Sequence, residues 1–201
     1  MFLSMVNCLD FLEAKHFHAA EHEMGLVAVG AAVHAALLSQ GEKIDERFLF
    51  PKDKKGKPQL AVMGKKDCGI EISISHSFPF ALGLANSGVG RVGCDVERVR
   101  DFISSTTDAF LTQKEKNILN AYSPRVKKIK TTLAWSYKES ILKAIGTGLR
   151  THPSKVDVSE LLKIKKQHLC VVKISHKTLM FQAWHKVLKK GYVVVVVAEL
   201  V

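Results

Sequence analysis

The sequence lacks the features of a membrane-bound, secreted or disulfide-stabilised protein. Its four cysteines are scattered and form no C-x-x-C pair, so we expect reduced thiols without metal or disulfide roles. Its longest nearly apolar run, residues 24–38, is shorter than the ~20 residues that cross a bilayer. Residues 1–15 lack a basic start followed by an apolar run, so we expect no secretory signal. These absences together predict a cytoplasmic protein that does not contact a membrane.

Aromatic residues are also few, at 7% of the chain, and none clusters with the lysines. Modules that bind single-stranded nucleic acid interleave basic and aromatic side chains. A nucleic-acid-binding module is therefore the weakest explanation of the positive charge.

Acidic residues are scarce in the second half of the chain. Residues 1–100 hold 12 basic and 12 acidic side chains, whereas residues 101–201 hold 18 and 7, so the whole excess of +11 lies there. This asymmetry favours an anionic partner, which could be nucleic acid, an acidic protein or a phosphorylated small molecule. A merely solvated basic face is the alternative.

Hydrophobic residues make up 47% of the chain, enough for a sizeable core, and their spacing predicts both helices and strands. The predicted helices are residues 25–38, 113–121 and a long one that starts after Ser123 and ends before Gly146. The predicted strands are residues 70–75, 80–85, 89–96, 170–174, 178–184 and 193–197.

This order of elements predicts an α+β fold with two similar lobes, residues 1–100 and 101–201, each an antiparallel sheet packed with helices and related by a pseudo-twofold axis. The short turns between the first three strands predict an antiparallel meander. The basic, Gly- and Pro-rich stretch 50–58 is expected to be an exposed loop.

The segment Gly93–Glu97 contains two carboxylates of interest. On a strand, Asp95 and Glu97 project from one face, where they repel each other unless a cation lies between them. Pairs of carboxylate oxygens suit Mg²⁺, which commonly recruits substrate phosphates as further ligands. The alternative is a polar strand end exposed to solvent.

The helix around Trp135 places Glu139 and Lys143 one turn apart. In the functional interpretation, Glu139 is a third oxygen ligand or a base, while Lys143, with Lys138, neutralises a phosphate. An ordinary surface ion pair between Glu139 and Lys143 is the alternative. His76, at the end of a strand, could be a structural residue or could meet a phosphate together with Ser75.

The order of these segments resembles the 4'-phosphopantetheinyl transferase superfamily, of the type named after the surfactin synthetase activator. The pattern S-x-S-H, G-x-D-x-E and W-x-x-K-E-x-x-x-K-A corresponds to residues 73–76, 93–97 and 135–144. A G-K-P element precedes them at residues 56–58, and G-T-G-L follows at residues 146–149.

The resemblance implies transfer of the phosphopantetheine arm of coenzyme A to a serine of an apo acyl or peptidyl carrier protein, which releases adenosine 3',5'-bisphosphate. It implies that Mg²⁺, or alternatively Mn²⁺, is held by Asp95, Glu97 and Glu139. Lys143 would bind the pyrophosphate, and Glu139 would take the serine proton, either directly or through a metal-bound water.

The same resemblance implies that four further side chains bind coenzyme A phosphates: Lys57, Ser75, His76 and, at the 3'-phosphate, Arg47. Carrier proteins of this kind are generally acidic, which suits the basic second half, and one chain with two lobes suffices as a monomer. The alternative enzyme class is a metal-dependent phosphodiesterase that acts on coenzyme A or nucleic acid.

Overall fold

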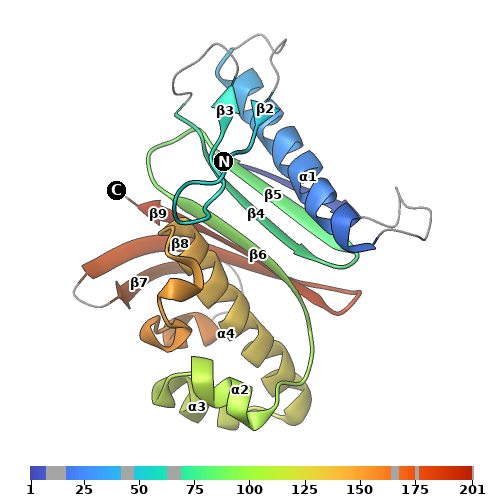
Figure 1. The fold of residues 1–201 in the computed structure, drawn as a ribbon. Coiled ribbons are helices and arrows are strands. Elements are labelled where there is room, and N and C mark those ends of the chain that lie inside the picture. The colour runs from blue at the N-terminus through green and yellow to red at the C-terminus, as the bar shows by residue number, and fades with distance from the viewer. Residues whose placement is uncertain (8–16, 42–47, 63–68, 164–167, 175–176, 201) are drawn as a thin grey trace.

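The computed structural model describes residues 1–7, 17–41, 48–62, 69–163, 168–174 and 177–200, and two antiparallel sheets dominate it (Figure 1). The first sheet has the strand order β1 (Phe2–Asn7), β5 (Phe80–Asn86), β4 (Glu71–Ser77). The second has the order β6 (Val92–Arg98), β9 (Tyr192–Leu200), β8 (Lys177–Leu188), β7 (His168–Ile174). A short ladder pairs β2 (Phe48–Leu49) with β3 (Ala61–Val62).

The helices are α1 (Phe17–Ser39), α2 (Ser104–Phe110), α3 (Gln113–Asn120), α4 (Pro124–Ala144) and α5 (Ser159–Leu162), with 3₁₀ turns at Gly148–Arg150 and Pro153–Lys155. The predicted α+β class, with a sheet and a long helix in each part, is confirmed. None of the helices in the described part of the chain has the length and apolarity that a membrane span requires.

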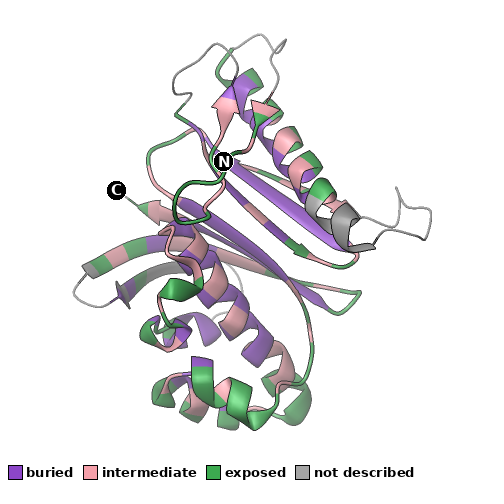
Figure 2. Ribbon diagram, in the orientation of Figure 1, coloured by how far each residue is buried: buried purple, intermediate pink, exposed green. Residues whose placement is uncertain are grey.

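Three clusters of buried side chains hold the layers together. One lies between α1 and the first sheet, one between α4 and the second sheet, and one between the two sheets. The unbroken run of valines in β9 follows from burial of both faces of this strand. Val193 and Val195 face α4, whereas Val194 and Val196 face the first sheet. Strands β5, β6 and β9 are accordingly buried along most of their length (Figure 2).

The predicted three-strand meander is wrong in its third member. β4 and β5 form the expected hairpin, but β6 pairs with β9, near the far end of the chain, with Asp95 opposite Val195. A short turn predicts a neighbour only when the next strand stays in the same sheet, and here the chain crosses to the second sheet. Strand β6, from the first half of the chain, thus belongs to the four-stranded sheet. The division into lobes at residue 100 stays a prediction.

One glycine in each sheet lets a helix approach the strands closely. A Cβ atom on Gly83 of β5 would lie 2.2 Å from the backbone nitrogen of Val29 in α1. A Cβ atom on Gly93 of β6 would lie 1.9 Å from the carbonyl oxygen of Ser140 in α4. Both contacts leave no room for a side chain, so each long helix lies directly on its sheet at a glycine. Gly93 thereby brings the helix that carries Glu139 and Lys143 against the strand that carries Asp95.

Local signals set the ends of several elements as predicted. Thr112 and Glu115 form the predicted capping box at the start of α3, and Pro124 occupies the first turn of α4. Gly146 follows the end of α4 with a φ of 70°, which is favourable for glycine. The sequence did not predict β1 or α2, whose apolar side chains show no clear period.

Candidate active site

Side chains of β4 join the two sheets where β4 lies beside β6. The Ser73 hydroxyl accepts a hydrogen bond from the Cys94 amide at 3.1 Å, and the Ser75 hydroxyl accepts one from the Val96 amide at 3.3 Å. Serine side chains thus replace the ordinary backbone ladder across this boundary, which we call the serine seam. The seam fixes the residue between the two bonded amides, Asp95.

Asp95 is 4% exposed, and the two oxygens of its carboxylate differ in their surroundings. Oδ1 accepts hydrogen bonds from the Ser75 hydroxyl at 2.8 Å and from the Lys143 ammonium at 2.8 Å. Oδ2 is buried and has no hydrogen-bond partner among the described residues. A buried carboxylate oxygen without a partner is costly, so this atom suggests a missing cation or donor.

Lys143 reaches the serine seam from the last turn of α4. Its ammonium also donates to the Ser75 hydroxyl at 2.9 Å and to the Cys94 carbonyl at 3.2 Å. Burial opposes the charge of this ammonium, but Asp95 and, to a smaller extent, Cys94 and Glu139 together outweigh burial, and the pKa of Lys143 is raised. Lys143 is therefore a fixed cation at the seam, and the alternative of a surface pair with Glu139 is not what the described residues form.

Glu97 lies two residues beyond Asp95, and Trp135 of α4 holds it. The indole nitrogen of Trp135 donates to Glu97 Oε1 at 3.1 Å. Burial raises the pKa of Glu97, and the negative charge of Asp95 raises it further. Burial also raises the pKa of Glu139; the ammonium of Lys143 opposes this rise, and Asp95 adds to it.

The three predicted metal ligands thus lie close enough for Asp95 to influence both glutamates. No group of three or more His, Cys, Asp or Glu side chains in the described ranges is already arranged to hold a metal ion. The donor set nevertheless fits a hard divalent cation. Asp95 offers a buried oxygen without a partner, and the raised pKa values of Glu97 and Glu139 show that both carboxylates lack enough compensating positive charge, which a cation would supply.

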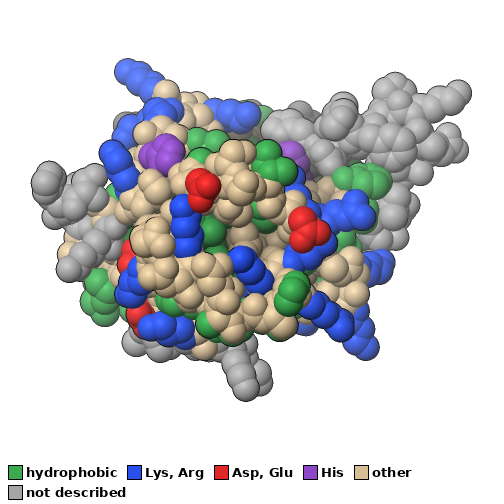
Figure 3. Space-filling view, turned by 90° about the horizontal axis from the view of Figure 1, so that it is seen from below, with side chains coloured by type: hydrophobic (Ala, Val, Ile, Leu, Met, Phe, Trp, Pro, Cys, Tyr) green, Lys and Arg blue, Asp and Glu red, His purple; other side chains and the backbone are tan. Residues whose placement is uncertain are grey.

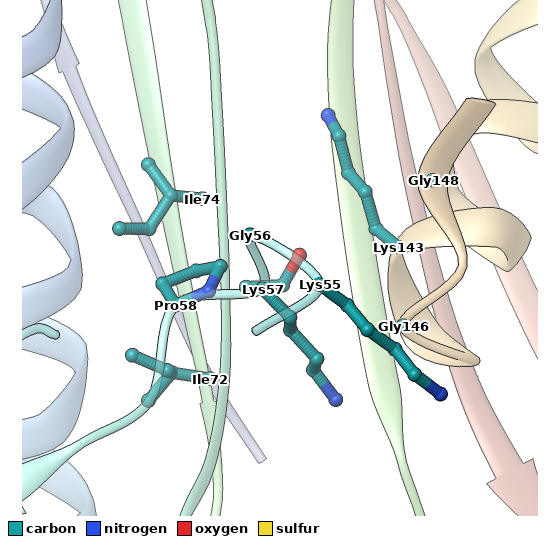
Figure 4. Close-up of a pocket in the computed structure, with 10 residues that line it drawn as sticks. Lys55, Gly56, Lys57, Pro58, Ile72, Ile74, Lys143, Gly146 and Gly148 are labelled. Carbon is teal, nitrogen blue, oxygen red and sulfur yellow. The ribbon is translucent and has the colours of Figure 1, made fainter. Parts of the chain in front are cut away.

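A cavity of about 220 Å³ opens beside Lys143, between the loop at residues 55–58 and the glycines that follow α4 (Figure 4). The carbonyl of Lys55 accepts a hydrogen bond from Arg150 Nη2 at 2.7 Å, so the predicted exposed loop is tied to the second sheet's side of the molecule. Lys57 lines this cavity, and its contact with a phosphate stays a prediction. The sequence did not indicate that its ammonium lies 2.5 Å from Glu71 Oε2.

A second hollow of about 360 Å³ adjoins the first, since Pro58 and Ile74 line both. His76 borders this second hollow together with Lys52 and Phe48. Ser75 does not accompany it: neighbouring residues of a strand face opposite ways, and Ser75 is turned to the seam. In this structure Ser75 holds Asp95 and Lys143, and the expectation that Ser75 and His76 meet phosphates of coenzyme A stays a prediction.

Lys138 is not a phosphate ligand in this structure, which corrects a second prediction. Its side chain is fully buried and lies 2.9 Å from the fully buried Glu115 carboxylate. Its ammonium also donates to the carbonyls of Pro153 and Val156. Lys138 thus joins α4 to α3 and to the segment around Pro153, away from the seam. Arg47, predicted at the 3'-phosphate, lies outside the described residues.

Basic side chains outnumber acidic ones on the face seen in Figure 3, the end of the molecule at which α2 and α3 lie. Some basic side chains of the second half of the sequence already have acidic neighbours, such as Lys116 with Asp108 at 2.6 Å and Lys128 with Asp101 at 2.7 Å. The surplus of basic charge in the second half of the sequence is therefore visible on this surface, although part of it is neutralised locally.

Comparisons with known proteins agree with the motifs. The model of the 4'-phosphopantetheinyl transferase superfamily matches residues 91–197, more than half of the chain, from just before β6 into β9. A search of curated proteins finds no match. Among solved structures, the chain is similar to the crystal structure of Thermotoga maritima holo-[acyl-carrier-protein] synthase (AcpS), at 19% identity and a TM-score of 0.37. The match covers 54% of this chain and spans 62% of the length of that one.

The matched region includes the strand that carries Asp95 and Glu97 and the helix that carries Glu139 and Lys143. These are the elements that the Gly93 contact presses together. By the match of the family model over more than half of its length, the chain belongs to the 4'-phosphopantetheinyl transferase superfamily.

Proposed function

We propose that this protein transfers the 4'-phosphopantetheine group of coenzyme A to a serine of an apo acyl or peptidyl carrier protein in a Mg²⁺-dependent reaction. The observation that supports this most is the meeting of Asp95, Ser75 and Lys143 at the serine seam, with one buried Asp95 oxygen left unpartnered. The four ordered motifs support the surfactin-synthetase-activator type, because they include the S-x-S-H and G-K-P elements.

The reaction exchanges a phosphoanhydride bond of coenzyme A for a phosphate ester bond to the carrier serine. The carrier serine oxygen bonds to the phosphorus nearest pantetheine, and the bond from that phosphorus to the bridging pyrophosphate oxygen breaks. The leaving group is adenosine 3',5'-bisphosphate, which keeps the electron pair of the broken bond. Because the pyrophosphate is anionic, negative charge must be neutralised both for the approach of the serine and on the leaving phosphate.

Asp95, Glu97 and Glu139 would hold the Mg²⁺, which when bound would supply positive charge to the pyrophosphate oxygens. Lys143 adds a second positive charge from the end of α4, held in place by Asp95 and Ser75. Lys57 and His76 line the two adjoining hollows and would bind further phosphates of coenzyme A.

Glu139 would accept the proton of the carrier serine. Burial raises its pKa above the ordinary value for glutamate, which brings its basicity closer to the pH at which a general base is effective. Because one chain carries both sheets, the three candidate ligands and both lysines, a monomer would be sufficient.

Intact-mass spectrometry of an apo carrier protein incubated with the protein, coenzyme A and Mg²⁺ tests this function. The expected result is a carrier that gains one phosphopantetheine group, with none gained when Mg²⁺ is chelated. The Glu139→Gln variant should abolish the gain. Glu160→Gln should not, because Glu160 is an exposed carboxylate paired with Lys114 and has no role in the proposed site. Loss of coenzyme A without any change in the carrier would show hydrolysis, and the proposal would then be wrong.

The basic second half is proposed to attract an acidic carrier. Attraction between exposed charges weakens as ionic strength rises, because salt screens it over about 8–10 Å. The apparent KM for the carrier should therefore rise with added salt while the KM for a short carrier-derived peptide changes less. A flat salt titration for the carrier would contradict this part of the proposal.

A further inference from the structure

Three lysines line the 220 Å³ cavity, and two of them, Lys57 and Lys143, are each already paired with a carboxylate. Lys143 is paired with Asp95 at the serine seam, and Lys57 is paired with Glu71 of β4. Figure 4 shows their side chains pointing in opposite directions from the cavity walls. Asp95 belongs to the proposed catalytic site, whereas Glu71 has no role in it, so the second pair needs its own explanation.

Lys57 is held by more than its ion pair. Its side chain is 12% exposed, and its ammonium also donates to the carbonyl of Ala144 at 3.4 Å. Ala144 is the last residue of α4, where unpaired carbonyls carry partial negative charge. The loop that carries Lys57 is fixed as well, because the Asp53 carboxylate accepts hydrogen bonds from the backbone amides of Lys55 and Lys57 at 2.7 and 2.8 Å. The position of Lys57 therefore does not depend on Glu71 alone.

Among the described residues, the Glu71 carboxylate forms an ion pair with Lys57 alone, although its charge also acts at longer range on Arg91. The nearby cation Arg91 is bound through two nitrogens to Glu199, each at 2.6 Å. Glu71 therefore acts mainly on Lys57, and its carboxylate is 37% exposed at the edge of the cavity. A phosphate that approaches Lys57 meets both a cation whose charge is already matched and a carboxylate that repels it.

We infer that Glu71 is an affinity-determining residue: it competes with the phosphates of the ligand for Lys57 and so weakens the binding of coenzyme A. This inference rests on the proposed function, since it takes coenzyme A as the ligand of the cavity. It assigns to Glu71 an effect on the binding of coenzyme A and of the product adenosine 3',5'-bisphosphate, and no contact with the reacting atoms.

Isothermal titration calorimetry with coenzyme A tests the inference on the full chain. Glu71→Gln keeps the shape of the side chain and removes its charge, so it should bind coenzyme A about tenfold more tightly, as expected for one charge a few ångströms away in partly solvated surroundings. The KM for coenzyme A should fall by a similar factor, while kcat for the carrier stays the same. Glu160→Gln, which removes an exposed carboxylate paired with Lys114, is the matched control and should bind as the parent does.

A double-mutant cycle with Lys57→Met shows whether Glu71 acts through Lys57. In the Lys57→Met background, the Glu71→Gln change should give a clearly smaller gain in affinity for coenzyme A, because only the direct repulsion of the phosphate is then relieved. An equal gain in both backgrounds would overturn the inference, because it would assign the effect to the general field of the protein. Unchanged or weaker binding by Glu71→Gln alone would also overturn it, the latter because Glu71 would then be needed to orient Lys57.

The failure of the inference and the failure of the proposed function give different results. If the parent protein binds coenzyme A but modifies no carrier, the proposed function fails while the affinities still decide the role of Glu71. If it does not bind coenzyme A at all, the proposed function fails and the inference fails with it. Mass-spectrometric measurement of the acetylation rate of Lys57 provides a check without any ligand: the rate should rise in Glu71→Gln, and an unchanged rate would contradict the pairing.

Discussion

Helix α4 carries two lysine–carboxylate pairs that start five residues apart and have opposite characters. The pair of Lys138 and Glu115 is fully buried, and backbone amides and carbonyls satisfy its remaining atoms. The pair of Lys143 and Asp95 lies at the serine seam beside a cavity, and one oxygen of Asp95 stays unpartnered. Similar residues on one helix thus form a closed structural pair and an open pair. The two pairs differ in that only the open pair leaves a carboxylate oxygen, Asp95 Oδ2, without a hydrogen-bond partner.

The Asp95→Asn change should have the largest effect on activity and a moderate effect on folding. It keeps the size of the side chain but removes the negative charge at the seam, so transfer to the carrier should fall by about a thousandfold. Thermal unfolding should change less than after loss of a fully buried pair, since Ser75 can still donate to the amide oxygen and the Lys143 side chain is 27% exposed. Intact-mass assays and calorimetry would measure both quantities, and near-normal transfer would remove Asp95 from the site.

The Lys138→Met change should show the reverse pattern. Removal of one partner leaves the Glu115 charge buried and unpaired, which should cost about 3–5 kcal/mol of unfolding free energy. Transfer activity per folded molecule should stay close to that of the parent. Combining Lys138→Met with Glu115→Leu should restore part of the lost stability in urea titrations.

A large loss of activity in folded Lys138→Met protein would break the comparison. It would mean that Lys138 reaches the ligand in a conformation that differs from this structure.

The contrast between these two lysines was only partly predictable from the sequence. Lys143 lies one turn after Glu139 and shares its face, so periodicity placed it correctly. Lys138 is adjacent to Glu139 and therefore lies about 100° away around the helix. That phase could have indicated that Lys138 points elsewhere. Its partner Glu115 lies on another helix, and no local pattern connects the two.

The strands show the same limit. Alternation and turn residues located β4, β5 and β6 to within a few residues, because these signals are local. They could not identify β9 as the partner of β6, since that pairing joins residues about a hundred positions apart. Nor could they show that Ser73 and Ser75 replace a backbone ladder, because a serine has the same letter whether its hydroxyl meets a ligand or an amide.

The Trp135→Phe change sharpens the comparison within the open site. It removes the indole donor of Glu97 but keeps an aromatic ring against Phe110, whose centroid lies 5.1 Å from that of Trp135. A lost hydrogen bond to a charged group corresponds to about a tenfold decrease in kcat if Glu97 must be oriented. The Mg²⁺ concentration for half-maximal activity should rise as well. Normal kcat and normal Mg²⁺ dependence would show that Trp135 only packs.

The pH dependence of stability should differ between the parent and a Glu97→Gln variant. Burial raises the pKa of Glu97 above its ordinary value of 4.5, so the folded state holds this proton more tightly than the unfolded state. This group therefore stabilises the fold less as pH rises from about 4.5 through the folded pKa. The melting temperature of Glu97→Gln relative to the parent should increase over that window and then level off. A constant difference would contradict the raised pKa.

The pairing of β6 with β9 also decides where this chain can be split into complementing fragments. A break after residue 100 would separate β6 from β9 and place Asp95 on a different fragment from Lys143. A break in the turn at residues 87–90, where Val89 is 82% exposed, keeps the four-stranded sheet and all three candidate carboxylates on one piece. The two pieces would then recognise each other mainly through the serine hydroxyls and the apolar layer between the sheets. A pair of complementing fragments of this chain is therefore best made by a break within residues 87–90.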